Sequence, residues 1–145
     1  LALQLLLEMA ERLVDRNTVS YNAAVSACAK TGAWAPALQL LCEMSHNRVG
    51  SNTITYSAAI TACEKGGEWT LSLQLLHEMS VTRVERGTIT YSAVISACEK
   101  SLKWAHALEL LFDMVDSLVE TNTITYNAAI SAIEKGGSWH QALRL

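Results

Sequence analysis

The sequence repeats itself every 35 residues, and this period constrains the fold more tightly than any local propensity does. Four residue types mark the period, as the following columns show: Tyr21, Tyr56, Tyr91 and Tyr126; Trp34, Trp69, Trp104 and Trp139; Met9, Met44, Met79 and Met114; Lys30, Lys65, Lys100 and Lys135. The segments 53–66 and 123–136 differ at only three of fourteen positions. The chain is therefore a tandem array of near-identical units.

Each unit predicts two amphipathic helices. Apolar residues of the segment 21–28 recur at i, i+3, i+4 and i+7, the spacing that lines one face of an α-helix. The segment 34–44 repeats this spacing after a break at Thr31 and Gly32. The single proline, Pro36, falls near the start of the second segment, where its missing N–H costs little. We call the two helices A and B.

Stacking of such hairpins predicts an all-α fold, because one hairpin cannot bury its apolar stripe alone. Alanines four residues apart on helix A would let successive A helices approach closely. We expect an α-solenoid, a right-handed superhelix of 35-residue helix-turn-helix repeats. The expected units are 18–52, 53–87 and 88–122, with a partial repeat at 1–17 (helix B only) and another at 123–145. Because the array starts and stops within a unit, we expect it to be an excerpt of a longer one, with any targeting segment outside it.

Composition supports a packed protein, with 50% hydrophobic and 17% charged residues. The apolar windows are far shorter than the ~20 residues of a membrane span, so no membrane association is expected. A net charge of -3 gives no general attraction for nucleic acid. Any binding of a polyanion must therefore come from a local surface.

A polar stripe along helix A is the strongest candidate for such a surface. It places two short polar side chains and a lysine at i, i+4 and i+8, away from the apolar face. Its members are Asn22, Ser26 and Lys30; Ser57, Thr61 and Lys65; Ser92, Ser96 and Lys100; and Asn127, Ser131 and Lys135. Stacked units would align them into a row suited to splayed bases and phosphates. A solvated helix face, with lysines complementing the helix dipole, explains the pattern equally well.

Other columns have structural interpretations. Asparagines precede helix A at Asn17, Asn52 and Asn122, with Gly87 at the matching place, and are ordinary N-cap residues. The tryptophans that open helix B are expected to anchor the packing. The glutamates before the lysines, which are Glu64, Glu99 and Glu134, are expected to face solvent.

The cysteines predict core positions. Cys28, Cys63 and Cys98 share a column that Ile133 completes, and isoleucine can replace neither a metal ligand nor a disulfide partner. The chain contains no zinc-ligand spacing, phosphate loop, nucleophile elbow or catalytic triad motif. We therefore expect no metal, no cofactor and no enzymatic activity in this chain.

The segments NTVSYNAAVSACAKTGAWAPALQLLCEM and NTITYSAAITACEKGGEWTLSLQLLHEM carry a resemblance to the pentatricopeptide-repeat family, over the whole chain and with P-type-like 35-residue units. Tetratricopeptide repeats are similar but have 34 residues and a different helix A pattern. The resemblance implies binding of single-stranded RNA, one base per repeat.

The resemblance also implies which residues would contact RNA. The base-reading residues would be Asn22, Ser57, Ser92 and Asn127 together with the closing residues Asn52, Gly87 and Asn122. The base-sandwiching residues would be Val19, Ile54, Ile89 and Ile124, and the phosphate-contacting residues Lys30, Lys65, Lys100 and Lys135. Family habit then gives C, or less well U, for Asn22 with Asn52, a weak purine preference for Ser57 with Gly87, A for Ser92 with Asn122, and a pyrimidine for Asn127, read 5′ to 3′ along the chain.

The expected function is sequence-selective binding of single-stranded RNA in organellar RNA processing, stability, editing or translation, with no small-molecule substrate. Family habit favours a chloroplast or mitochondrion, and protein partners are a further class. The rival is a protein- or peptide-binding scaffold of the tetratricopeptide kind. A third class, an RNA-processing enzyme, would need a domain beyond Leu145, such as a zinc deaminase.

Overall fold

The structure is a computed structural model, and it describes residues 4–5, 8, 17–136 and 140. Its elements are α2 (Thr18–Thr31), α3 (Trp34–His46), α4 (Thr53–Lys65), α5 (Trp69–Val81), α6 (Thr88–Lys100), α7 (Trp104–Asp116) and α8 (Thr123–Gly136). No strand occurs in these ranges, which confirms the all-α prediction. Most of the partial repeat predicted at 1–17, together with Met9 and Trp139, lies outside the described residues.

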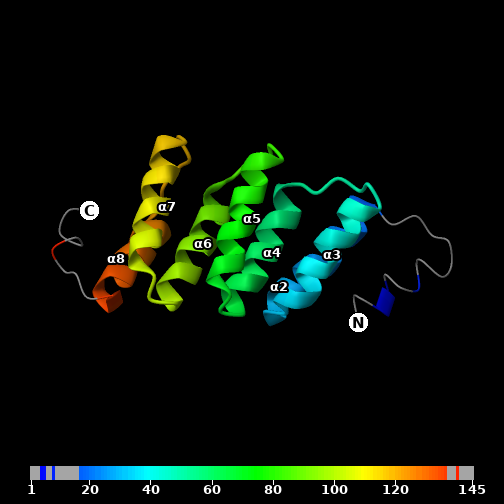
Figure 1. Cartoon of the computed structure of the whole chain (residues 1–145), viewed down its shortest axis with the longest axis horizontal. Helices are drawn as coiled ribbons and strands as arrows, with labels where there is room; N and C mark the ends of the chain where they lie inside the picture. The colour runs from blue at the N-terminus through cyan, green and yellow to red at the C-terminus, as the bar shows by residue number, and fades with distance from the viewer. Residues whose placement is uncertain (1–3, 6–7, 9–16, 137–139, 141–145) are drawn as a thin grey trace.

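The helices stack as an α-solenoid, as predicted. The A helices are α2, α4, α6 and α8, which begin 35 residues apart and pack directly on one another, while each of the B helices α3, α5 and α7 packs on A helices. No Cα atom of one of these B helices comes within 8 Å of a Cα atom of another. Figure 1 shows the resulting elongated row of hairpins. The A helices thus form a continuous spine, and the B helices stand apart on one side of it.

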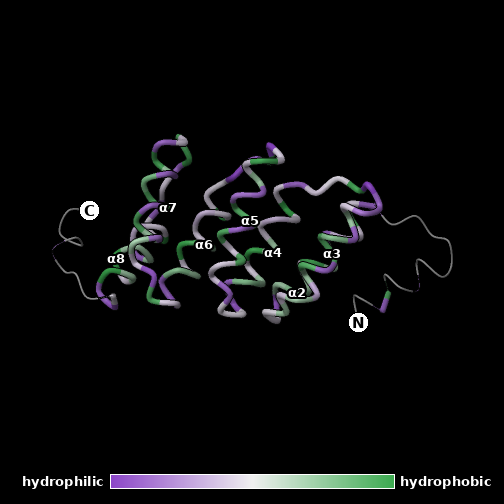
Figure 2. Tube along the Cα trace, viewed as in Figure 1, coloured by the Kyte–Doolittle hydropathy of each residue, from purple (hydrophilic) through white to green (hydrophobic). Residues whose placement is uncertain are grey.

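The core runs along this spine. The helices α2, α4 and α6 bury a tyrosine each, and α8 buries Ala129 and Ala132. Each B helix buries a methionine, which is Met44, Met79 or Met114. Along each helix, hydrophobic and hydrophilic segments alternate (Figure 2), as one-sided burial requires. The cysteine column is core as predicted, with Cys63, Cys98 and Ile133 fully buried.

Both turns of the unit use one residue in the left-handed region. Gly32 and Gly67 end the A helices at φ 71° and 79°, and Leu102 occupies the same place in the third unit at φ 58°. The turns from B to A use Arg48, Arg83 and Leu118 in the same way. After Gly32, the Ala33 N–H donates to the Cys28 carbonyl at 3.0 Å, so the helix end is satisfied inside the hairpin.

The tryptophans anchor one unit to the next, as expected of packing residues. Trp34, Trp69 and Trp104 are partly buried against the core. A Cβ atom added to Gly66, at the end of α4, would lie 2.3 Å from Cδ1 of Trp34, and one added to Gly136 would lie 2.1 Å from Cδ1 of Trp104. The rings of Trp34 and Trp104 therefore rest on a glycine at the end of the following A helix, and Ser101 takes this place for Trp69.

Threonine hydroxyls anchor the other end of the A helices. Oγ1 of Thr18 donates to the Gly50 carbonyl at 3.0 Å, and Thr53 and Thr88 donate in the same way to the carbonyls of Glu85 and Glu120, at 3.0 and 2.8 Å. Each bond ties the start of an A helix to the closing segment of its own unit. Within the described ranges no helix is long and apolar enough to cross a membrane.

Candidate nucleic-acid interface

The N-termini of the A helices are held by their asparagine caps. Oδ1 of Asn17 accepts the Ser20 N–H at 3.1 Å and Oδ1 of Asn52 accepts the Thr55 N–H at 3.1 Å, each within a capping box. Oδ1 of Asn122 accepts the Thr125 N–H at 3.0 Å. The N-cap prediction is confirmed for all three, and Gly87 holds the same place on α6 without a side-chain bond.

The structure brings together two side chains that the resemblance assigns to the same base. Nδ2 of Asn22 on α2 donates to Oδ1 of Asn52 at 3.3 Å, and Oγ1 of Thr55 donates to Oδ1 of Asn22 at 2.5 Å. These bonds orient the Asn22 amide, which is half-buried, while Asn52 is exposed. One N–H of Asn22 and both N–H groups of Asn52 are not used in this cluster, so donors remain at the edge of the spine.

At the next pair of A helices, different side chains make the corresponding contact. Gly87 has no side chain, and the hydroxyls of Ser57 and Thr90 pair with each other at 2.9 Å. Thr90 is the counterpart of Thr55, so the threonine at this position pairs with an amide of the preceding A helix in one unit and with a hydroxyl in the next. Of the remaining predicted readers, Ser92 is half-buried and Asn127 and Asn122 are exposed.

A column of aliphatic side chains stands exposed beside these polar groups. Val19, Ile54, Ile89 and Ile124 are 75%, 60%, 75% and 66% exposed, and each is the second residue of an A helix that buries most of its other large apolar residues. Covering such side chains stabilises a complex by about 25 cal/mol for each Å² removed from water. The edge therefore combines apolar platforms with oriented hydrogen-bonding groups, which is what a stacked, hydrogen-bonded ligand needs.

The lysines lie at the other end of the A helices and are exposed, but their surroundings differ. Nζ of Lys100 donates to Oε1 of Glu64, and Nζ of Lys135 donates to Oε1 of Glu99 at 2.7 Å. The prediction that Glu64 and Glu99 face solvent is wrong, since their side chains are only 13% and 18% exposed. The reason is that the A helix of the following unit packs over them.

A serine of that following helix completes each of these pairs. Oγ of Ser96 donates to Oε1 of Glu64 at 3.1 Å, and Oγ of Ser131 donates to Oε1 of Glu99 at 2.8 Å. Burial alone would raise the pKa of Glu99, but the hydrogen bonds from Lys135 and Ser131 outweigh it and hold the pKa below its ordinary value. Glu99 is thus an ionised partner at neutral pH. Glu134, in the same column, is exposed as expected.

Lys65 has a different neighbour. The first unit has Ala29 where the later units have glutamate, and Nζ of Lys65 lies 3.5 Å from the carbonyl oxygen of Lys30. In the part of the chain that the structure describes, neither Lys30 nor Lys65 forms an ion pair. The sequence pattern predicted equivalent lysines, but the structure separates Lys65 from Lys100 and Lys135.

The buried cysteines offer no reactive thiolate. Burial raises the pKa of the Cys63 and Cys98 thiols to about 11, so both are protonated at neutral pH. Among the described residues, no group of three or more His, Cys, Asp or Glu side chains is arranged to hold a metal ion.

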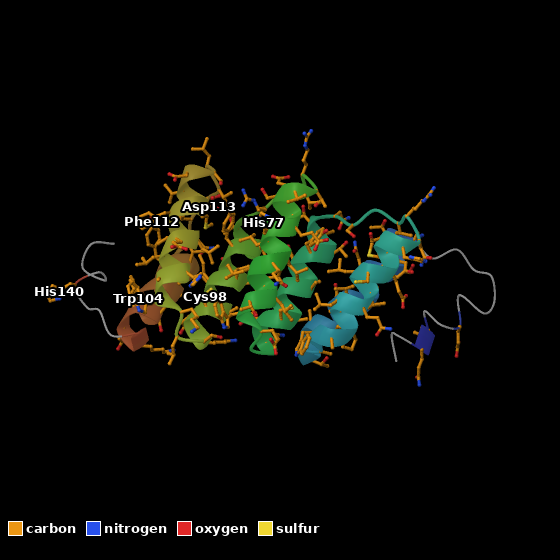
Figure 3. All side chains as sticks on the ribbon, viewed as in Figure 1. His77, Cys98, Trp104, Phe112, Asp113 and His140 are labelled. Atoms are coloured by element: carbon orange, nitrogen blue, oxygen red, sulfur yellow. The ribbon has the colours of Figure 1, made fainter. Side chains whose placement is uncertain are left out.

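The B-helix side carries different features. A hollow of about 910 Å³ lies between α3 and α5, and it is lined by Leu38, Leu41, Leu71 and Leu75 and by none of the predicted RNA-contacting residues. Asp113 lies on α7 (Figure 3). It accepts hydrogen bonds from the hydroxyl of Tyr91 at 2.5 Å and from Nη1 of Arg86 at 3.3 Å. Sequence reasoning missed this cluster, whose polar atoms tie a B helix to its own A helix.

Family models place the chain among known repeats. The PPR repeat family model matches residues 16–65, and the PPR repeat model matches residues 54–81 and 89–117, which together cover more than half of the chain. The chain belongs to the pentatricopeptide-repeat (PPR) family. No curated protein matches it in sequence.

Solved structures show the same fold. The PPR domain of Arabidopsis thaliana protein-only RNase P 1 in complex with tRNA aligns with a TM-score of 0.83 at 15% identity, over 99% of this chain and 77% of that one. PPR10 in complex with an 18-nt psaJ RNA element aligns with a TM-score of 0.78 at 18% identity, over 96% of this chain, and PPR10 from maize with 0.74 at 22% identity, over 98%. The chain spans about a fifth of the PPR10 chain.

Proposed function

We propose that the chain binds single-stranded RNA along the exposed edge of its A helices, reading one base with each unit. The observation that carries the proposal is the contact of Asn22 with Asn52 at 3.3 Å, which joins the two side chains assigned to one base into a single oriented group. Exposed Val19 and Ile54 flank it in sequence and would cover the two faces of that base. The RNA complexes of two proteins with the same fold support the kind of ligand.

The base order follows from the reading residues. Asn22 with Asn52 would select C, Ser57 with Gly87 a purine, Ser92 with Asn122 A, and Asn127 a pyrimidine. The tetranucleotide CAAC satisfies this order. Exchanging the first and third specificities would convert it to AACC, which has the same composition.

A binding experiment with matched RNAs tests the assignment. The wild-type protein should prefer a fluorescein-labelled RNA containing CAAC over one containing AACC by about fivefold to tenfold for each mismatched base. The double variant Asn22→Ser, Ser92→Asn should reverse this preference. A variant on the B-helix side, Gln39→Ser, serves as the control and should leave the preference unchanged. If the wild type and the double variant each bound the two RNAs with equal affinity, the base-reading assignment would be wrong.

The rival function is binding of a peptide, and the hollow between α3 and α5 is the observation that favours it. Its leucines, with polar side chains such as Ser45, Gln74 and Glu78 beside them, would suit an amphipathic segment of a partner. Leu71→Asp should abolish such binding and leave RNA affinity unchanged. If Leu71→Asp instead removed RNA binding from a folded protein, the edge of the A helices would not be the RNA site.

The biological role we propose is that of a non-catalytic RNA-binding region acting in an organelle, chloroplast or mitochondrion, where it would occupy or present a transcript for processing, stability, editing or translation. Expression of the tagged full-length protein in a plant cell and fractionation of organelles would test the location. Recovery in the cytosol alone would contradict it.

A further inference from the structure

The two glutamate–lysine pairs lie between units, not within them. Glu64 belongs to α4 and Lys100 to α6, while Glu99 belongs to α6 and Lys135 to α8. In each pair, one carboxylate oxygen receives both the lysine ammonium and a serine hydroxyl of the following A helix. The helix packing therefore presents a fixed anionic acceptor to each of these lysines.

A phosphate would have to compete with that acceptor. The carboxylate neutralises most of the charge of the ammonium group that it holds and repels a phosphate that approaches the remaining N–H groups, whereas a solvated ammonium gives up only water and counterions. The carboxylate is also part of the folded chain, so its local concentration does not depend on the solution. Lys100 and Lys135 are about half exposed, at 51% and 49% of their side chains, so a phosphate can reach them.

The first pair of units provides an internal comparison. Ala29 stands where Glu64 and Glu99 stand, and the hydroxyl of Thr61, which occupies the serine position, turns instead to the Ser57 carbonyl at 2.8 Å. Lys65 consequently faces only a backbone carbonyl, at 3.5 Å. The replacement of glutamate by alanine thus removes the whole anionic arrangement, not only one charge.

We propose that Glu64 and Glu99 are positioning residues that hold Lys100 and Lys135 away from RNA phosphates, whereas Lys65, which has Ala29 at the matching position, contacts a phosphate without this competition. This inference rests on the proposed RNA binding. It makes the contribution of each lysine depend on the residue at the glutamate position of the preceding unit.

The proposal sets the salt dependence of binding. Each phosphate neutralised on a single strand contributes about -0.7 to the slope of log K against log salt concentration. Release of both held lysines should therefore steepen the wild-type slope by about -1.4.

The experiment uses the intact protein and the CAAC-containing RNA, with fluorescence anisotropy over a range of salt concentrations. The variant Glu64→Gln, Glu99→Gln keeps an acceptor for each serine but removes the charges. Its affinity should rise by about twofold to fivefold for each substitution, the range that one partly exposed ion pair contributes, and its slope should steepen. The opposite variant, Ala29→Glu, places a carboxylate opposite Lys65 and should weaken binding and flatten the slope.

Glu134→Gln is the matched control. It removes one negative charge from the same column, but Glu134 is exposed and holds no lysine among the described residues. If it raised affinity as much as Glu64→Gln does, general charge would account for the effect and the proposal would be overturned. The proposal would also be overturned if the salt slopes of the Glu64→Gln, Glu99→Gln variant and of Ala29→Glu equalled that of the wild type. If the wild type still preferred CAAC to AACC in that case, the proposed function would stand. No binding by any variant would refute the RNA function itself, and the proposal with it.

Discussion

Substitution of Gly66 by alanine tests the way in which consecutive units are joined. The glycine backbone has φ -78°, which alanine adopts without strain, so the substitution acts only through space. The added Cβ would lie 2.3 Å from Cδ1 of Trp34 and 3.2 Å from the carbonyl oxygens of Ala62 and Gly32. Ordinary van der Waals contact begins near 3.4 Å, so the Trp34 ring must move by about 1 Å or more.

This overlap and the lost freedom of glycine act on the free energy of unfolding in opposite directions. Inserting one methyl group into a packed contact destabilises a protein by about 1–3 kcal/mol. Replacing glycine by alanine recovers about 0.4–1 kcal/mol by restricting the unfolded chain. We therefore expect Gly66→Ala to lower the free energy of unfolding by about 1–2 kcal/mol.

Urea denaturation followed by circular dichroism measures the effect. Gly50→Ala is the control, because nothing lies within 4 Å of its added Cβ, and it should be neutral or slightly stabilising. In a Trp34→Leu background the overlap disappears, and Gly66→Ala should no longer destabilise. A penalty of the same size in both backgrounds would refute the proposed contact between the tryptophan and the glycine.

Three further predictions follow from burial, charge and capping. A thiol reagent at pH 8 should modify Cys42 rapidly in the native protein and leave Cys63 and Cys98 unmodified until urea is added, because Cys42 is exposed and the other two are buried with pKa values of about 11; equal reaction rates would contradict this. Because the pKa of Glu99 is lowered by folding, its ionised form should stabilise the protein above the ordinary glutamate pKa of 4.5 and lose this effect as the pH falls through the folded value; thermal melts of wild type and Glu99→Gln should therefore converge at low pH, and a constant difference would exclude the mechanism. Asn17→Ala should lower the free energy of unfolding in urea by about 1 kcal/mol through loss of the α2 cap, whereas Asn17→Ser should retain most of the cap's stabilisation; an unchanged free energy in Asn17→Ala would show that the cap is not needed.

The sequence predicted the architecture because the period is a property of the chain itself. The spacing of apolar residues placed both helices, and the column of three cysteines and Ile133 could only be core. The break at Gly32 and Gly67 also predicted the turn between the helices. Leu102 in the same column could not be anticipated as a left-handed residue, because its conformation is imposed by the hairpin and opposes its own preference.

The contacts between units were less accessible to sequence reasoning. Glu64 seemed solvent-facing because local periodicity describes one helix and says nothing of the neighbour that covers it. A signal did exist, since glutamate in one unit is followed 36 residues later by lysine and 32 residues later by serine, and Ala29 breaks this pattern together with Thr61. The roles of Asn22 and Asn52 toward RNA came from the family resemblance alone, and their contact across 30 residues is a result of the fold.

The separation of the B helices gives the array a mechanical property. Its units are joined along the A-helix spine, and no Cα atom of α3, α5 or α7 lies within 8 Å of a Cα atom of another of these helices. Bending between units would therefore change the spacing of the B helices more than that of the A helices and their polar edge groups. The ring contact of Trp69 with His106, 5.2 Å between centroids, joins α5 to α7 and would resist such bending there.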